Sequence, residues 1–192
     1  MATQKQRSEA TRTLLLKAFK DSLLKNGLEN TTTQAVLIET QLSKGAMYHH
    51  FKSKTEIVEA IYAEESKTTI ERAIAEAKRD GGPLEQLKSA CLTWTELARA
   101  PGVSKILFEI GPKALGPEKA KEIEDAYSLH LIETLLKKAI AAGEITNADP
   151  ALIAAFLNAL VEQTALYDLR TGGTSLALLE RAITALFESF KP

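Results

Sequence analysis

The stretch from Ser43 to Lys54 reads SKGAMYHHFKSK and decides how the N-terminal part of this chain is interpreted. It holds three lysines, two histidines and a tyrosine, around two large apolar residues, Met47 and Phe51. These two are four positions apart, so on a helix they lie on the same side and can be buried together. The remaining side chains are then presented outward. Such a helix buries little and offers many donors.

The residues around this stretch predict two short helices joined by a tight turn. Thr31–Thr33 offer N-caps for a helix to about Glu39, Gln41–Leu42 forms the connection, and Ser43 caps a second helix to about Phe51. Ser53–Glu56 has the form of a capping box and begins a long helix to about Arg79. With a first helix from about Glu9 to Lys25, this order predicts a helix-turn-helix unit.

The exposed side of the second short helix suits a DNA groove. Gly45 and Ala46 are small where a close fit is needed, and the neighbouring donors can reach base edges or phosphates. These donors are Lys44, Tyr48, His49 and His50. Lys54 and the amides after Ser53 lie at a helix N-terminus, which attracts phosphate.

A metal site is a poor alternative for the two histidines. His49 and His50 are adjacent, so they are about 100° apart on a helix and do not face one ion. No Cys, Asp or Glu nearby completes a site, so no metal is expected. A polar surface helix with incidental histidines is the other alternative.

Charge and composition point the same way. The net charge is −1, but residues 1–54 carry nine Lys or Arg against four Asp or Glu, and residues 55–192 carry 15 against 21. A basic N-terminal quarter indicates an anionic partner, unless the surface charge is scattered at random. The single cysteine, the polar N-terminus and the absence of an apolar run of 18 residues favour a cytoplasmic protein.

The rest of the chain has helical periodicity and almost no strand signal. The long helix is apolar at both ends and polar at Glu64–Thr69, so a domain boundary is expected near it. Further helices are expected near residues 84–98, 104–110, 118–142, 150–170 and 174–190, with a loop from Gly111 to Pro117. The predicted fold is all-α with about nine helices. Residues 1–54, with the start of the connecting helix, form the helix-turn-helix domain, and residues 55–192 form a larger helical domain.

The N-terminal motif resembles that of the TetR family of bacterial transcriptional regulators. The family signature is, loosely, G-x-x-x-T-T, a short helix, then S-x-G-x-x-Y-x-H-F-x-x-K. This chain has the corresponding residues at the same spacing over about residues 10–60: Gly27, Thr31, Thr32, Ser43, Gly45, Tyr48, His50, Phe51 and Lys54. It departs at Gln41, where the family usually has glycine, and at Leu37, where it usually has alanine.

The resemblance implies roles for the matching residues. Thr32 and Lys54 would hold phosphates, Tyr48 and His50 would contact the DNA backbone, and Lys44 and Gly45 would approach bases. Together with the residues selected above, the expected DNA-binding set is Thr32, Thr33, Lys44, Gly45, Ala46, Tyr48, His49, His50 and Lys54.

For residues 55–192 the resemblance implies small-molecule binding and dimerisation. Aromatic residues, and polar residues on otherwise apolar helices, are candidates for a ligand pocket, although each polar one alone could be a satisfied core or interface group. The expected pocket residues are Cys91, Trp94, Phe108, Tyr127, His130, Leu131, Asn158, Glu162 and Tyr167.

The last two helices carry more apolar surface than one core face requires. They predict a homodimer interface, unless they close the core of a single chain. Its expected residues are Phe156, Leu160, Leu169, Leu176, Leu179, Ile183, Leu186 and Phe190.

The function expected is that of a ligand-responsive regulator without a cofactor. It would be a repressor released from a pseudo-palindromic DNA operator by a small apolar or amphipathic molecule. A regulator without ligand response and a small all-helical enzyme are the alternatives. The chain has no Gly-rich phosphate loop, metal-ligand spacing or nucleophile motif to support an enzyme.

Overall fold

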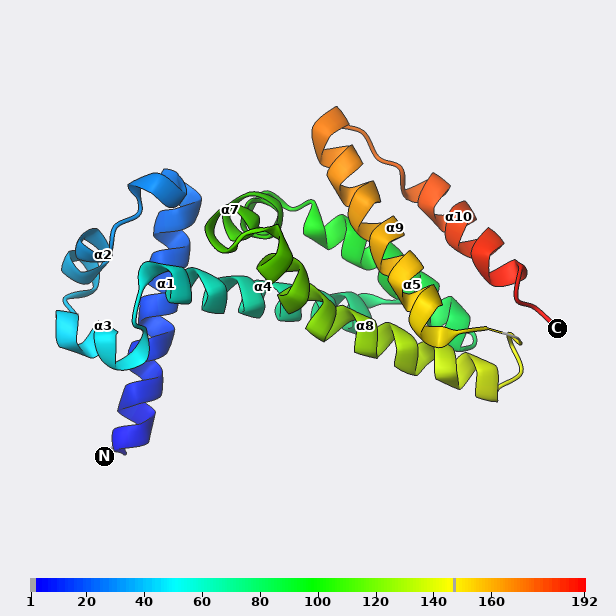
Figure 1. Cartoon of the computed structure of the whole chain (residues 1–192), viewed down its shortest axis with the longest axis horizontal. Coiled ribbons are helices and arrows are strands. Elements are labelled where there is room, and N and C mark those ends of the chain that lie inside the picture. The colour runs from blue at the N-terminus through cyan, green and yellow to red at the C-terminus, as the bar shows by residue number, and fades with distance from the viewer. Residues whose placement is uncertain (1–2, 147) are drawn as a thin grey trace. The chain divides into compact units, whose positions relative to one another are not determined.

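The computed structural model describes residues 3–146 and 148–192, and within these ranges it is helical with no strand (Figure 1). A π-helix, Lys105–Ile110, joins α6 to α7 without a break, so the described residues form nine helical segments. The all-α prediction is therefore confirmed. The α-helices are α1 (Gln4–Asn30), α2 (Thr33–Thr40), α3 (Lys44–His50), α4 (Lys54–Glu76), α5 (Pro83–Ala98), α6 (Pro101–Ser104), α7 (Gly111–Leu115), α8 (Pro117–Ala141), α9 (Pro150–Thr171) and α10 (Leu176–Glu188).

The chain divides into two compact units. The first contains the residues up to Glu65 together with Lys105–Ala120, and the second contains Ser66–Ser104 and Lys121–Pro192. α4 contributes its first part to one unit and its second part to the other. The functional boundary expected at residue 54 stays a prediction.

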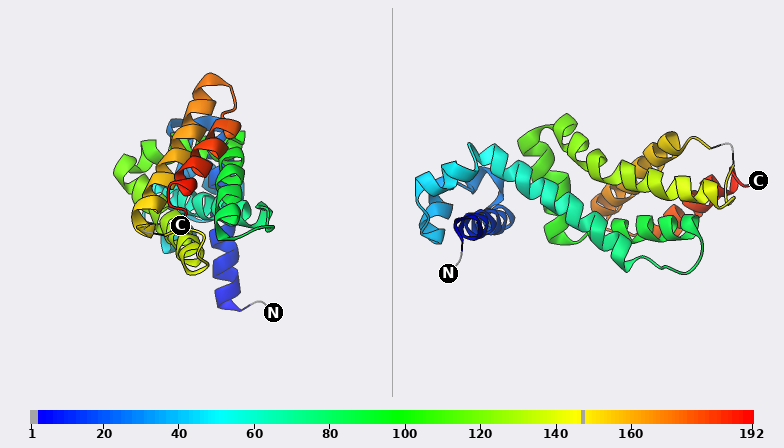
Figure 2. Two further views of the ribbon diagram at one scale, coloured as in Figure 1. Left: turned by 90° about the vertical axis from the view of Figure 1, so that its right-hand side faces the viewer. Right: turned by 90° about the horizontal axis from the view of Figure 1, so that it is seen from below.

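The core of the first unit is built on one face of α1. This face packs against α2 and α3 (Figure 2). α2 and α3 bury Val36 and Met47, and Phe51 follows at the end of α3, so the inward orientation predicted for Met47 and Phe51 is confirmed. The buried residues of α1 are Leu15, Leu16, Ala18, Phe19 and Leu23.

The turn between α2 and α3 contains the expected strained residue. Gln41 has φ 57° and ψ 24°, the left-handed conformation that glycine adopts without cost. For a residue with a Cβ this conformation costs on the order of 1 kcal/mol. Gln41 thus adopts, at the end of α2, the backbone conformation that a glycine would provide.

The prediction of a loop from Gly111 to Pro117 is wrong, because Gly111–Leu115 forms α7 and α8 begins at Pro117. Pro112 is the second residue of α7 and follows the π-helix Lys105–Ile110 directly, so it does not end the helical segment. Gly111 is buried against the ring of Tyr62, and a Cβ at this glycine would lie 2.1 Å from the ring. The glycine therefore allows close packing of two helices.

The second unit has a core formed by α5, α8, α9 and α10. α5 packs against α9 and α10, and α9 and α10 run side by side (Figures 1 and 2). Asp149 caps α9, because its carboxylate accepts hydrogen bonds from the amides of Ala151 and Leu152. The core contains Leu87, Cys91, Leu136, Ala139, Ile153, Leu157, Val161, Leu179, Ile183 and Phe187, among others.

Candidate DNA-binding surface and effector site

Helix α3 is short and presents most of its side chains to solvent. The hydroxyl of Ser43 accepts a hydrogen bond from the amide of Ala46 at 3.1 Å and caps the helix, as predicted. Met47 is buried, while Lys44, Gly45, Tyr48 and His49 are exposed, and Ala46 and His50 are partly buried. The residues of α3 that were expected to meet DNA are therefore exposed or partly exposed, while Met47 is buried.

Gly45 has no role in the packing of the protein. A Cβ added there would meet only the Ser43 hydroxyl, at 3.9 Å, and the backbone is in an ordinary helical region. Glycine inside a helix costs roughly 0.5–1 kcal/mol relative to alanine. Nothing within the fold therefore requires a glycine at this position.

Two donors on α3 lie against each other. The ammonium group of Lys44 is 5.7 Å from the ring centroid of Tyr48, in the geometry of a cation–π contact one helical turn apart. Both side chains are exposed, so the pair holds a cation and a phenol hydroxyl together on the outer face. The rings of His49 and His50 are 5.1 Å apart and edge-to-face. Across the described residues, no group of three or more His, Cys, Asp or Glu could hold a metal ion.

The start of α2 forms a second part of this surface. The Thr32 hydroxyl accepts a hydrogen bond from the amide of Ala35 at 3.2 Å. Thr32 is exposed and Thr33, the first residue of the helix, is partly buried. Helix N-terminal amides are a favourable place for a phosphate group.

Lys54 is the first residue of α4, as expected, and it also has a partner within the protein. Its ammonium group donates a hydrogen bond to the carbonyl of Leu28 and is partly buried. The carboxylate of Glu56 accepts from the amide of Lys52 at 2.6 Å, while the Ser53 hydroxyl accepts from the amide of Glu56 at 3.1 Å. The Ser53 half of the predicted capping box is therefore present, whereas Glu56 accepts from the amide of Lys52 in place of the amide of Ser53. Lys54 connects α4 to the end of α1 in addition to any contact with phosphate.

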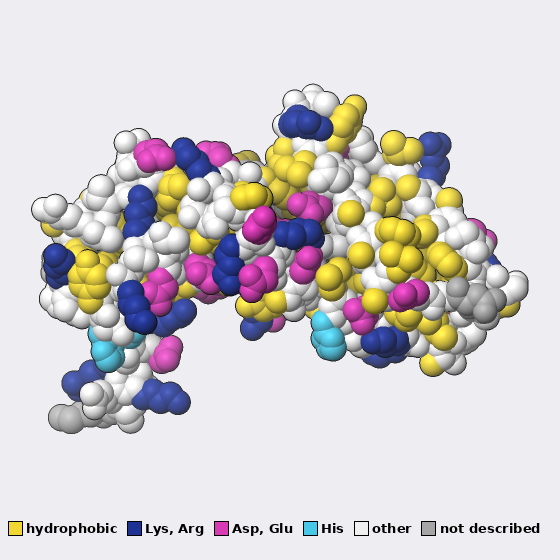
Figure 3. Space-filling model, in the orientation of Figure 1, with side chains coloured by type: hydrophobic (Ala, Val, Ile, Leu, Met, Phe, Trp, Pro, Cys, Tyr) yellow, Lys and Arg dark blue, Asp and Glu magenta, His cyan; other side chains and the backbone are white. Residues whose placement is uncertain are grey.

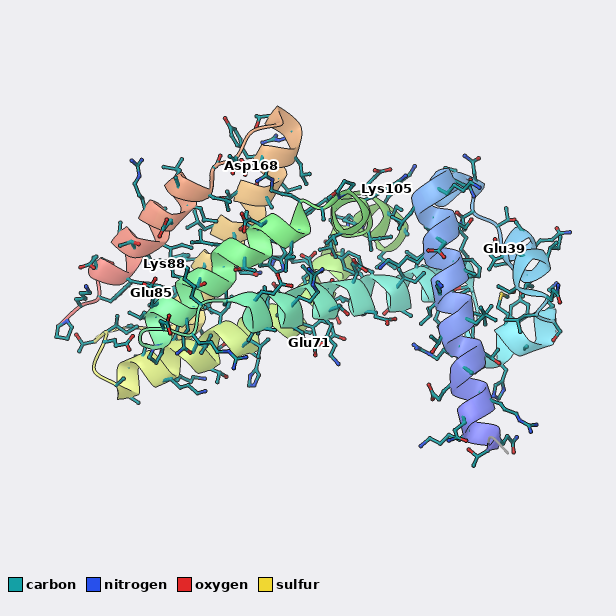
Figure 4. All side chains as sticks on the ribbon, turned by 180° about the vertical axis from the view of Figure 1, so that it is seen from behind. Glu39, Glu71, Glu85, Lys88, Lys105 and Asp168 are labelled. Carbon is teal, nitrogen blue, oxygen red and sulfur yellow. The ribbon has the colours of Figure 1, made fainter. Side chains whose placement is uncertain are left out.

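The C-terminal part of α1 is held by lysines from later segments. Gly27, with φ 78°, interrupts the helix there, and carbonyls near a helix end attract cationic donors. Lys105 of the π-helix donates to the carbonyl of Leu24 at 2.8 Å (Figure 4). Lys113 lies 3.0 Å from Glu29, and its hydrogen bond and charge lower the pKa of that carboxyl. These contacts attach Lys105–Leu115 to the unit that carries α3.

The residues expected in a ligand pocket do not form one group. Phe108 belongs to the first compact unit and the others to the second. His130 and Tyr167 are exposed, because the phases of α8 and α9 turn them outward, and their place in a pocket stays a prediction. Trp94, Tyr127 and Leu131 are partly buried. Cys91 lies in the core, and burial raises the pKa of its thiol to about 12, so it is no nucleophile at neutral pH.

Asn158 and Glu162 take part in a polar group between α8 and α9. The amide of Asn158 donates to the carboxylate of Asp125 at 3.0 Å, and Lys121 pairs with Asp125 and lies 3.8 Å from Glu162. Asn158 therefore has a protein partner. The pair was expected to meet either a partner or a ligand, and within the described residues it meets a partner.

Ser66 and Thr69 are buried polar residues that were not predicted as site residues. They lie on α4, three positions apart, in the segment expected to be polar all round, and each is 3% exposed. The hydroxyl of Ser66 has no hydrogen-bond partner among the described residues. A buried polar atom without a partner is uncommon, and an unoccupied ligand position is one physical reason for it.

The apolar surface of the last two helices lies mainly on α9. Phe156 and Leu169 are exposed, whereas Leu160, Leu176, Leu186 and Phe190 are partly buried. Leu179 and Ile183, expected in a dimer interface, are buried in the core of the protomer, and that expectation is wrong for them. The large exposed residues include Leu152, Tyr167 and Leu178, and Figure 3 shows hydrophobic side chains gathered over α9 and α10.

The fold and the exposed face of α3 define the class: a helix-turn-helix protein that binds DNA, with a second helical unit. The sequence pattern described as "Bacterial regulatory proteins, tetR family" matches residues 15–61, and that described as "Tetracyclin repressor-like, C-terminal domain" matches residues 84–189. The chain belongs to the TetR family. It is a DNA-binding transcriptional regulator of a family that consists of regulators, not enzymes.

Relatives and solved structures agree with this assignment. The chain is 25% identical over 167 residues to the nucleoid occlusion factor SlmA of Haemophilus influenzae. The matched region covers 83% of this chain and 74% of SlmA. A TetR-family transcriptional regulator from Pectobacterium atrosepticum has the same fold, with a TM-score of 0.73 and 21% identity over 97% of this chain and 94% of its own. FadR from Bacillus subtilis, solved with stearoyl-CoA, has a TM-score of 0.67 and 19% identity over 91% and 96% of the two chains.

α9 is long and apolar enough to cross a membrane by length and composition alone. Core helices of soluble proteins also meet this criterion, and α9 packs against α5 and α10 on one side. Its composition is accounted for by a core on one face and an apolar exposed surface on the other.

Proposed function

We propose that this regulator is a homodimeric repressor that occupies a pseudo-palindromic operator and leaves it when a small apolar or amphipathic molecule binds the second unit. The observation that carries the DNA-binding part is the outer face of α3, where exposed Lys44 and Tyr48 flank a glycine that the fold does not need. The proposed DNA contacts are those of α3 and the start of α2, with Lys54 contributing to phosphate binding at their edge. The proposed location is the cytoplasm.

A selection on random duplexes tests the DNA-binding part, and Gly45→Ala tests its geometry on the enriched duplex. The wild type should bind with a Kd of about 10⁻⁸ M or tighter at moderate salt. Gly45→Ala should raise the free energy of unfolding by about 0.5–1 kcal/mol, because alanine favours the helix. The same change should weaken operator binding about tenfold, because the methyl group separates α3 from the base edges, a loss of roughly 1.4 kcal/mol.

Close approach of DNA at Gly45 predicts that Gly45→Ala increases the stability of the protein while it decreases the affinity for the operator. Gly173→Ala is the matched control, because Gly173 lies in a loop of the second unit and a Cβ there would meet only the Thr171 hydroxyl at 3.5 Å. It should leave DNA affinity unchanged. If Gly45→Ala bound the operator as tightly as the wild type, close approach at Gly45 would be refuted, and a selection that enriched no sequence would refute specific binding.

The ligand-responsive part rests on the buried face of α4. Ser66 provides an unpaired hydroxyl beside buried Thr69, with apolar Ala73 one turn further along the helix. A buried hydroxyl on an otherwise apolar face suits a molecule that has an apolar body and one hydrogen-bonding group. We therefore propose that the effector is amphipathic and that its polar group meets Ser66.

Thermal unfolding with decanoate, dodecanol and oleate tests this effector class. A probe at a hundredfold excess over its Kd should stabilise the protein by about 2.7 kcal/mol. Ser66→Ala should keep or raise the stability of the free protein and reduce the shift that the probe causes. Ser128→Ala is the control, because the Ser128 hydroxyl already donates to the Glu124 carbonyl at 3.1 Å. No shift with any probe, or equal shifts in both variants, would contradict the proposal.

A further inference from the structure

The first three turns of α1 extend beyond the hydrophobic core. The helix begins at Gln4, but its first buried residue is Leu15. It is capped at its start, since Thr3 and Gln6 exchange side-chain-to-backbone hydrogen bonds of 3.3 Å and 2.8 Å in a capping box. An exposed helical end is marginal in water without tertiary contacts. A capped extension with no apolar face therefore has a use outside the core.

Two cations lie on the core-facing side of this extension. Lys5, Arg12, Leu16 and Leu23 follow one another at spacings of seven, four and seven residues, so they share one face of α1. Leu16 and Leu23 on that face are buried. The face of α1 that packs into the core at Leu16 and Leu23 therefore carries cations, Arg12 and Lys5, nearer the N-terminus.

Arg12 is positioned beside the recognition helix. Its guanidinium lies over the ring of Phe51, 5.3 Å from the centroid, and Phe51 is the residue that ends α3. Helices α1 and α3 pack together within the first unit. The cationic face of α1 therefore continues the α3 surface past its C-terminal end. Figure 3 shows Lys or Arg side chains on this extension close to histidine side chains.

The cations of the extension are not neutralised by the protein. Lys5, Arg7 and Arg12 form no ion pair within the described residues, and Glu9 is the one acidic residue between Gln4 and Leu14. Arg7 lies about 200° around the helix from Lys5, so it points away from the face shared by Lys5 and Arg12. The charge that faces the α3 side is therefore supplied by Lys5 and Arg12.

We infer that Lys5 and Arg12 form an additional phosphate-binding site, which holds the DNA backbone outside the bases that α3 contacts. The inference rests on operator binding through α3. Charge complementarity identifies the ligand: DNA carries dense negative charge along its backbone, and unpaired cations next to a groove-binding helix meet phosphates first. Arg12, which lies over Phe51, would set the position of the extension, and exposed Lys5, nearer the N-terminus, would reach further along the strand.

The test compares Lys5→Ala with Arg7→Ala on a selected operator of two lengths. The two variants remove one positive charge each from the same exposed helix, but from opposite faces. On a duplex with long flanks, Lys5→Ala should weaken binding about fivefold to tenfold per protomer at low salt and reduce the slope of log affinity against log salt by about one per protomer. Arg7→Ala should change the affinity less than twofold. On a duplex cut at the edges of the α3 half-sites, the Lys5→Ala effect should disappear.

The outcomes separate this inference from operator binding itself. If the wild type binds the operator but both variants lose affinity equally, or neither does, the additional site is refuted while DNA binding stands. An effect of Lys5→Ala that persists on the short duplex also refutes a flanking position. If the wild type enriches no duplex at all, operator binding and the additional site are overturned together. Circular dichroism checks that each variant keeps the helix content of the wild type.

Discussion

Phe156→Glu is expected to convert a dimer into monomers and to weaken operator binding at least a hundredfold. Leu152, Phe156 and Tyr167 are each 51–52% exposed along one side of α9. Leu178 of α10, at 60%, adds to the exposed apolar surface. Large exposed apolar surfaces of this kind mark interaction sites. In the proposed two-fold dimer each chain would present the same surface, so one substitution alters the interface twice.

The energy expected from this change is large because Phe156 is an exposed aromatic residue that lies between Leu152 and Tyr167 on the same side of α9. A large aromatic side chain at the centre of an interface is often worth about 2–4 kcal/mol, and a glutamate there would bury a charge without a partner. A monomer would hold one half-site and lose the contribution of the second to operator binding. Sedimentation equilibrium measures the assembly state, and titration of the operator measures the affinity.

Ile74→Glu is the matched control for the dimer prediction. Ile74 lies on α4 in the second unit and is 41% exposed, so the chemical change is similar but the position is outside the proposed interface. This variant should remain dimeric and bind the operator normally. A Phe156→Glu protein that still sedimented as a dimer at micromolar concentration would show that α9 does not form the interface.

The recognition helix was predictable because its determinants are local. Met47 and Phe51 are four residues apart, and this spacing alone fixes which side of α3 is outward. Ser43 and Thr32 were recognised as caps because a cap acts on amides two or three residues away. Features of this kind depend on a single turn of helix, which the sequence shows directly.

The interface was less predictable because sequence does not distinguish an apolar face that meets its own chain from one that meets another. α10 has one strongly apolar face, and the core of the protomer uses it, so Leu179 and Ile183 are buried. α9 is apolar nearly all round, and once α5 and α10 cover one side, the surplus at Leu152 and Phe156 stays exposed. The helix with more apolar surface than its neighbours cover is therefore the better candidate for an interface.

The polar sites depended on distant contacts. Ser66 and Thr69 are small polar residues that a periodicity argument assigns to the surface, yet they are buried. Lys54 has a partner 26 positions away, the carbonyl of Leu28, just after the interruption of α1 at Gly27. No local pattern indicates which carbonyl a lysine will reach. Sequence reasoning identified the donor, but it could not show that the fold also uses it.

The second large effect concerns a buried charge in the second unit. Arg99→Ala is expected to lower the free energy of unfolding by about 3–5 kcal/mol, because it removes the cation from a fully buried carboxylate. Asp168 on α9 lies with one oxygen 3.5 Å from Arg99, and the same oxygen accepts the amide of Ser175 at 3.0 Å (Figure 4). Its other oxygen is buried and has no hydrogen-bond partner among the described residues.

The two partners should not be equivalent. Arg99 keeps 26% of its side chain exposed and also donates to the carbonyl of Gly173 at 2.6 Å, so it can return to water if Asp168 is neutralised. Asp168→Asn should therefore cost less than Arg99→Ala, since the neutral amide can still accept from Ser175. The Arg99→Ala/Asp168→Asn double variant should recover part of the loss, because no unpaired charge is left in the core.

Denaturant or thermal unfolding of the four proteins measures this cycle. For a chain of this size each kcal/mol corresponds to roughly 2–4 °C in Tm. The Tm of Arg99→Ala should therefore lie about ten degrees below that of the wild type. Arg72→Ala is a suitable control, because its ion pair with Glu76 is exposed and worth little. If Arg99→Ala cost no more than Arg72→Ala, or if Asp168→Asn were the worse of the pair, the buried carboxylate would not depend on Arg99. The junction of α9 and α10 would then be held by the Ser175 amide and the packing around it.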